Sequence, residues 1–307
     1  MKNKTSLQIL LMLLAVCLAG LDQTALAQIA TFSPQPTNNV NTTTRMVYHN
    51  GPLMLGTTDL YVVWYGCWDD TCGTAGDTAT QSILADFLVY LGGSLYFQIN
   101  NTYPDSLGRT PSGGLLYANA VFDRYSHGVE LTASDIQEII RNKIVSGELP
   151  EDPTGIYVVL ASADVGSAAT GLCVPSMPPH HGIGDDGFGI PFRYAFVGNP
   201  LRCPSTAAAQ FFAGGKQLPT PNGHLSADAM ASTLAHVFST TITNPYGTGW
   251  FDRYGLQSAD KCAGQFGQTY LTANGATANL KLGPRDFLIQ ENWVNSKKGH
   301  CAMNSSQ

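Results

Sequence analysis

The chain has 307 residues, of which 12% are charged, and its formal net charge is −6. Its length is sufficient for a large hydrophobic core. Lys297 and Lys298 are its only adjacent basic residues, so the sequence has no basic stripe of the kind that binds nucleic acid or anionic lipid.

The N-terminus is typical of a secretory signal peptide. Lys2 and Lys4 precede an apolar run at 7–20, and Ala25-Leu26-Ala27 is a small-residue cleavage site. The run is shorter than the roughly 20 residues of a membrane span. We therefore expect a signal peptide at 1–27, an extended arm rich in Asn, Thr and Pro at 28–44, and a single domain at 45–307.

The segments that follow the arm alternate between strand and helix patterns. Runs of β-branched and aromatic residues predict strands, and apolar residues at helical spacing predict helices. The expected elements are strands at 60–65, 115–122 and 156–160, a helix at 81–91, and a helix that Thr132 or Ser134 caps and whose buried face is Ile136, Ile139, Ile140 and Ile144.

A loop-rich insertion is expected at 162–191, because this stretch is dense in Gly, Pro and Asp. Within it, the segment 182–187 matches the dinucleotide-binding glycine pattern. No strand pattern precedes this match and no helix pattern follows it, so we interpret it as a flexible loop.

The last part of the chain has a less regular pattern. We expect a short strand at 194–197, a helix that begins at Ser226 or Asp228 and ends at Pro245, and a last strand at 287–290. The fold class is therefore α/β or α+β, with one domain, a central mixed sheet and flanking helices.

Six cysteines follow the signal peptide, and an even number in a secreted chain indicates disulfides. Their spacing alone leaves the connectivity open. A zinc ribbon is the alternative, but it needs two closely spaced pairs, and only Cys67 and Cys72 are close. The six are Cys67, Cys72, Cys173, Cys203, Cys262 and Cys301.

After the predicted signal peptide, three glycosylation sequons begin at Asn41, Asn100 and Asn304. Each predicts an exposed loop or terminus if the host glycosylates the protein. Asn100 lies in a polar segment with turn-forming residues, so we expect it to be accessible.

The segment 234–245 resembles a metallohydrolase helix that has lost its acidic residues. In such a helix a ligand His is followed by a catalytic Glu, and a second ligand lies one turn later on the same face. Here His236 is followed by Val237, and Thr240 stands at the second-ligand position. A structural His that bonds to backbone is the favoured interpretation, since catalysis by zinc needs three ligands and an open position.

Metal binding stays open as an alternative at two places. Asp260, or Asp252, could approach His236 from a downstream loop and form a non-catalytic metal site or an active zinc site. His180 and His181, which precede a pair of aspartates, could chelate a cation, alone or together with His236. We expect no cofactor, with zinc as the alternative.

Two further groups could contact a ligand. Asp123, Arg124, Tyr125 and His127 lie between a strand and a helix, where an Asp–Arg pair that braces the turn is the favoured interpretation and ligand contact the alternative. Aromatic residues could form a platform for sugar rings, whereas their structural interpretation is core packing and loop anchoring. These residues are Trp64, Tyr65, Trp68, Trp250 and Phe251.

Ordered sequence blocks from about residue 45 to Cys301 resemble the plant EXORDIUM and phosphate-induced protein family, whose members are secreted and linked to cell expansion. The blocks are Tyr48-His49-Asn50-Gly51-Pro52, Leu60-Tyr61-Val62-Val63-Trp64-Tyr65-Gly66, Asp123-Arg124-Tyr125-Ser126-His127-Gly128, Tyr194-Ala195-Phe196-Val197-Gly198-Asn199, Pro221-Asn222-Gly223, Asp260-Lys261-Cys262, and Trp293 with Cys301.

The resemblance carries three expectations. It favours disulfides Cys67–Cys72, Cys173–Cys203 and Cys262–Cys301. The family usually has His-Glu-x-x-Glu where this chain has His236-Val237-Phe238-Ser239-Thr240, so this member should be further from hydrolysis. It also implies an extracellular or cell-wall protein that regulates growth by binding an extracellular protein or a wall polysaccharide.

Overall fold

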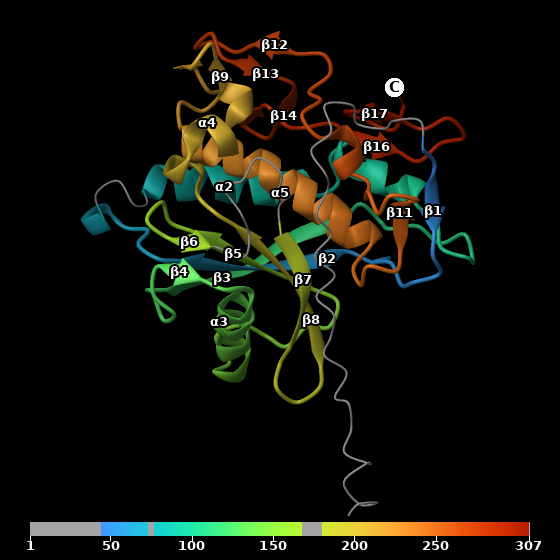
Figure 1. Ribbon diagram of the computed structural model, residues 1–307, viewed down its shortest axis with the longest axis horizontal. Coiled ribbons are helices and arrows are strands. Elements are labelled where there is room, and N and C mark those ends of the chain that lie inside the picture. The colour runs from blue at the N-terminus through green and yellow to red at the C-terminus, as the bar shows by residue number, and fades with distance from the viewer. Residues whose placement is uncertain (1–43, 73–76, 168–179, 307) are drawn as a thin grey trace, which may run out of the picture. The chain divides into compact units, whose positions relative to one another are not determined.

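A five-stranded sheet lies at the centre of the fold (Figure 1). The computed structural model describes residues 44–72, 77–167 and 180–306, and the strands of this sheet have the order β3-β2-β5-β8-β7. The first four run parallel, whereas β7 is antiparallel to β8. They are β2 (Thr58–Tyr65), β3 (Leu115–Asp123), β5 (Ile156–Ala161), β7 (His180–Asp185) and β8 (Pro191–Val197). The fold is α/β, one of the two predicted classes, and the predicted central mixed sheet is confirmed.

Helices cover both faces of the central sheet (Figure 1). α2 (Thr78–Leu91) and α5 (Leu225–Thr243) lie on one face, and α3 (Ala133–Val145) lies on the other. Successive residues of a strand point to opposite faces, so Val62 packs in the cluster that contains α2 and α5, and Val63 packs against α3. Because both faces are covered, the inner strands are continuous apolar runs.

Side-chain caps fix where two of these helices begin. The Oγ1 of Thr132 accepts the N–H of Asp135, and the Asp135 carboxylate accepts the N–H of Thr132, which confirms the cap predicted there. α2 begins three residues before the expected Gln81, because Asp77 accepts the N–H of Thr80 and so caps an earlier turn.

The expected loop at 182–187 is wrong for its first four residues, which belong to β7. A Cβ on Gly184 would collide with the ring of Phe192, and one on Gly182 would press on the ring of Tyr194. These glycines therefore accommodate large aromatic side chains on the neighbouring strand. The sequence pattern indicated flexibility where the structure needs close strand packing.

The strand predicted at 287–290 is wrong beyond its first residue. The N–H of Ile289 donates to Oδ1 of Asn279 over 2.8 Å, and the N–H of Gln290 donates to Oγ of Ser232 over 3.1 Å. Side chains thus take the hydrogen bonds that a partner strand would have provided.

Short elements surround the central sheet. Twelve of the described strands form two-stranded pairs: β1 (Met46–Tyr48) with β11 (Trp250–Asp252), β4 (Glu130–Leu131) with β6 (Gly166–Ser167), β9 (Phe212–Ala213) with β10 (Lys216–Gln217), β12 (Tyr270–Leu271) with β13 (Thr277–Ala278), β14 (Leu280–Leu282) with β15 (Arg285–Phe287), and β16 (Asn292–Val294) with β17 (His300–Ala302). The short helices are α4 (Pro204–Ala207), η1 (Asp70–Cys72), η2 (Phe97–Thr102), η3 (Pro200–Arg202), η4 (Ala209–Phe211) and η5 (Asp260–Cys262).

Two of the expected disulfides are confirmed. They join Cys67 to Cys72 and Cys262 to Cys301, with Cα–Cα distances of 5.5 Å and 5.6 Å. Cys203 is also disulfide-bonded, whereas Cys173, its expected partner, lies outside the described residues.

The expectation that Asn100 is accessible is wrong. Its side chain is fully buried in η2 and donates to the carbonyl of Phe97 over 2.9 Å, so a glycan cannot be attached in this fold. Asn304 is partly exposed near the C-terminus, as expected, and Asn41 lies outside the described residues.

The predicted signal peptide and all but the last residue of the predicted arm also lie outside the described residues. Thr44, which ends the arm, is buried rather than extended into solvent. No helix in the described part of the chain is both long enough and apolar enough to cross a membrane.

Candidate functional site

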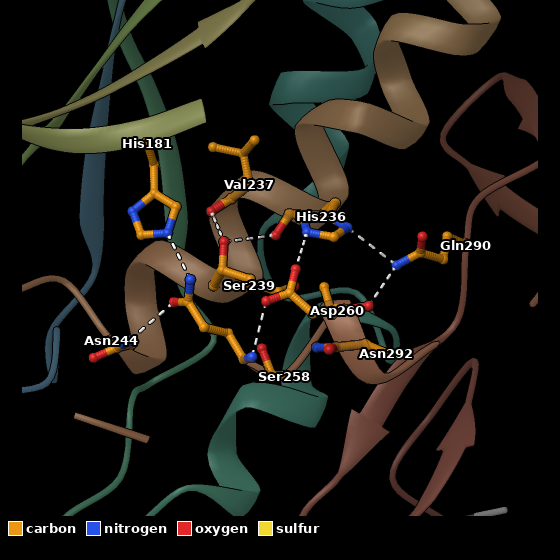
Figure 2. Close-up of polar contacts among 12 residues, drawn as sticks. His181, His236, Val237, Ser239, Asn244, Ser258, Asp260, Gln290 and Asn292 are labelled. Atoms are coloured by element: carbon orange, nitrogen blue, oxygen red, sulfur yellow. Dashed lines mark hydrogen bonds and ion pairs between the residues drawn. The ribbon is translucent and has the colours of Figure 1, made fainter. Parts of the chain in front are cut away.

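α5 is buried along almost its whole length, and His236 lies near its middle (Figure 2). The helix begins at Leu225, next to the expected Ser226, and ends before Pro245 as predicted. Val237 packs in the apolar core and points away from Asp260. A helix that is apolar on most sides lies inside the fold, so His236 on its polar stripe is buried as well.

Both ring nitrogens of His236 have side-chain partners (Figure 2). Nε2 lies 2.9 Å from Oδ1 of Asp260, and Nδ1 lies 3.2 Å from Nε2 of Gln290. The same Gln290 amide donates to the carbonyl of Ala259 over 2.8 Å. The amide therefore presents N–H groups to both partners, and Nδ1 of His236 must accept. The network assigns the neutral tautomer, with its proton on Nε2 and donated to Asp260.

Asp260 is held as a carboxylate inside the protein. Burial by itself raises the pKa of Asp260, but the hydrogen bonds that its carboxylate accepts from His236 and from the N–H of Gln257 lower this pKa below 3.8. Oδ2 of Asp260 accepts the N–H of Gln257 over 2.8 Å. Hydrogen bonds to the charged form thus outweigh desolvation.

Gln257 extends this network to the central sheet. Its Nε2 lies 3.2 Å from Nε2 of His181 on β7, and its Oε1 accepts from Asn244 over 3.0 Å. The predicted approach of Asp260 to His236 is confirmed. His181 belongs to the same network, because Gln257 contacts both Asp260 and His181. The side chain of His180 is outside the described part of the structure.

The hydrogen bonds of His236 and Thr240 do not fit a catalytic zinc centre. Neither ring nitrogen of His236 is free for a metal or for a proton transfer, and Thr240 donates to the carbonyls of His236 and Val237 rather than toward a ligand site. Among described side chains, the one group of three with metal-ligand spacing is Cys67, Asp69 and Cys72, whose two sulfurs are joined in a disulfide. The prediction that the His236 ring hydrogen-bonds to backbone was wrong, because its partners are the side chains of Asp260 and Gln290.

Asp252, the other acid expected near His236, lies in a different buried cluster. Its carboxylate is 3.3 Å from Nζ of Lys261, which also donates to the carbonyl of Thr44 over 2.8 Å and lies 4.4 Å from the Trp293 ring centroid. Burial lowers the pKa of Lys261, while the charge and hydrogen bond of Asp252 oppose this shift. Sequence reasoning missed this cluster, since a single Lys in a short motif does not predict complete burial.

The cluster after β3 does brace its loop, although through different partners from the expected Asp–Arg pair. Asp123 accepts the N–H and hydroxyl of Ser126, both over 2.9 Å, and Tyr125 donates to Asp164 over 2.6 Å. Arg124 instead reaches Asp69, which precedes η1, at 3.4 Å. The backbone N–H of His127 donates to Tyr65, and its ring lies 3.3 Å from Glu138. These contacts join the loops that follow β2, β3 and β5.

The expected aromatic platform divides into two parts. Trp64, Tyr65 and Trp68 are buried, so the sugar-platform prediction is wrong for these three. Trp250 is half-buried and donates to the carbonyl of Pro104 over 3.0 Å, which anchors its loop as the structural interpretation expected. Phe251 lies on the other face of β11 and stacks on the ring of His49, with ring centroids 3.6 Å apart.

Known proteins resemble this chain over most of its length. Residues 46–286 match the family model described as the phosphate-induced protein 1 conserved region. Protein EXORDIUM-like 3 from Arabidopsis thaliana is 29% identical over 272 residues, which cover 81% of this chain and 80% of that protein. Protein EXORDIUM-like 5 from the same plant is 28% identical, with 84% and 77% covered, and Protein PHOSPHATE-INDUCED 1 from Nicotiana tabacum is 26% identical, with 82% and 79% covered. No solved structure matches significantly.

Proposed function

The chain belongs to the EXORDIUM and phosphate-induced protein family, and from that membership we propose that it is a secreted protein of the extracellular space or cell wall that contributes to growth by binding a partner rather than by catalysis. The N-terminal signal pattern supports secretion. Expression in a secreting host and N-terminal sequencing of the mature protein test this part. A chain that stays inside the cell, or that keeps residues 1–27, would contradict it.

The paired ring of His236 is the observation that best supports a non-catalytic role. A general base needs one nitrogen that can take a proton from water, and a zinc ligand needs one free lone pair. Here Asp260 accepts from Nε2 and Gln290 donates to Nδ1. The acids that would complete the site are replaced by Val237 and Thr240, which bond or pack elsewhere.

Metal analysis tests the non-catalytic proposal. The secreted protein is purified without chelators, and its zinc content is measured by plasma mass spectrometry for the wild type and for His236→Ala. We expect no stoichiometric zinc in either protein and no hydrolysis of peptide or ester substrates. Stoichiometric zinc in the wild type that is lost from His236→Ala would contradict the proposal and would favour the divergent hydrolase.

A cell-wall polysaccharide is the partner class that the exposed aromatic residues favour. His49 and Tyr254 are exposed on the β1–β11 side of the protein, and rings in such positions can stack on the apolar faces of sugars. Sedimentation of the secreted protein with isolated wall material tests this. Protein that stays in the supernatant at every wall concentration would direct the search to a soluble extracellular protein instead.

A further inference from the structure

The two-stranded sheet of β1 and β11 has one face that packs inward and one that is open. Met46 pairs with Asp252 across the strands, and both are buried. Val47 pairs with Phe251, and the alternation of side chains puts these two on the opposite face, where Val47 is 47% exposed. His49 is exposed and lies flat on Phe251. We call this the outer face of β1–β11.

Two arginines stand at one end of the outer face. Arg45 precedes Met46 and Arg253 follows Asp252, so the register makes them the next cross-strand neighbours. The strands stay together beyond the ladder, because Thr44 donates to Asp252. Both arginines are exposed. Like charges opposite each other are unfavourable, unless an anion lies between them.

Neither arginine has an acidic partner among the described residues. The described contacts of Arg253 are with Tyr254, whose hydroxyl accepts from it over 2.9 Å and whose ring lies 4.7 Å away. Asp252, the nearest acid in sequence, faces inward and is paired with Lys261. A chain with a net charge of −6 thus presents two adjacent uncompensated cations beside exposed aromatic rings.

We propose that the outer face of β1–β11 binds an acidic polysaccharide, with uronate carboxylates at Arg45 and Arg253 and sugar rings against His49 and Tyr254. Guanidinium groups bind carboxylates in a bidentate manner, and aromatic rings pack on sugar faces. The net negative charge of the whole chain disfavours an anionic membrane, because a membrane would face far more of the surface than this strip. The inference rests on the proposed binding function and specifies its ligand class.

The test measures binding of unesterified oligogalacturonate to the full secreted chain by isothermal titration calorimetry at low and high salt. The methyl-esterified oligosaccharide is the neutral probe. Arg45→Gln/Arg253→Gln removes the two cations from the outer face. Lys297→Gln/Lys298→Gln is the matched control, because it removes two exposed positive charges elsewhere. Circular dichroism verifies that both variants are folded.

We expect the unesterified probe to bind in a salt-dependent manner and the esterified probe to bind weakly. The arginine variant should bind at least about tenfold more weakly, an effect typical of arginines that anchor an interface, and the lysine variant should bind like the wild type. Equal losses in both variants, no loss in the arginine variant, equal binding of both probes, or no binding at all would each overturn the inference. If the wild type still sediments with wall material in those cases, the proposed function stands and only this ligand and face are wrong.

Discussion

Removal of the His236 imidazole should destabilise the protein strongly, because it leaves a charge buried without its partner. In His236→Ala the side chain of Asp260, which is 4% exposed, keeps the N–H of Gln257 as its described hydrogen-bond donor. Losing a hydrogen bond to a buried charged group in this way costs about 1.5–3 kcal/mol. In His236→Ala/Asp260→Ala the carboxylate at this site is removed as well, so the double variant should cost less than the sum of the single variants by about 0.5–3 kcal/mol.

Urea unfolding with the disulfides intact measures these costs, by linear extrapolation of the unfolding free energy. His224→Ala is the control. His224 occupies the N-cap position of α5, but its side chain makes no capping hydrogen bond and is 40% exposed, so the loss of unfolding free energy should stay within about 0.5 kcal/mol. Costs for His236→Ala below about 1 kcal/mol, or strictly additive costs in the double variant, would refute the reasoning. A loss of wild-type stability in EDTA would show instead that a metal, and not Asp260, holds the ring.

Three further predictions concern the core. Lys261→Met should cost about 3–5 kcal/mol, because it leaves Asp252 buried without its cation, and Lys261→Met/Asp252→Asn should recover part of that loss in the same urea assay. Gly184→Ala should lower the unfolding free energy by about 1–3 kcal/mol through its clash with Phe192, and a smaller Leu at 192 should relieve it. Because its pKa is lowered, Asp260 contributes stability above pH 3.8 that is lost as pH falls through the lower folded-state value, so unfolding free energy should fall more steeply with acid in the wild type than in Asp260→Asn.

The central sheet could be predicted from the sequence because its signals are local. The run at 60–65 is apolar on both faces, which indicates a buried strand. For α3, Thr132 indicates where the helix begins, and the regularly spaced isoleucines indicate its buried face. The wrong predictions concern residues whose structure depends on a contact with a segment far away in the sequence. Gly182 and Gly184 belong to a strand only because the aromatic rings of β8 occupy the space of their side chains. Likewise, Asn100 is buried because η2 packs against both α5 and β16, which lie far from it in the sequence.

The candidate site could be predicted only in part, for the same reason. The helix pattern identified His236, and the order of the chain suggested Asp260. Gln290 and Gln257 could not be found, since glutamines carry no spacing signal and reach the site from loops 54 and 21 residues away. Yet Gln290 determines what His236 can do, because the Gln290 amide donates a hydrogen bond to Nδ1, the ring nitrogen that would have to bind a metal or accept a proton.

The absence of acids at positions 237 and 240 and the paired ring of His236 both favour the interpretation that α5 carries no catalytic site. Val237 lies in the apolar core that joins α5 to the sheet, so a carboxylate at this position would be buried away from Asp260 and would raise the cost of folding rather than supply a base. An acid at 240 would in turn meet a ring whose two nitrogens are already bonded. A hydrolytic role at His236 would need changes in the helix and in the Gln290 segment together. The exposed outer face of β1–β11 needs no such change to bind a ligand, so function in this chain is better sought at that surface than at His236.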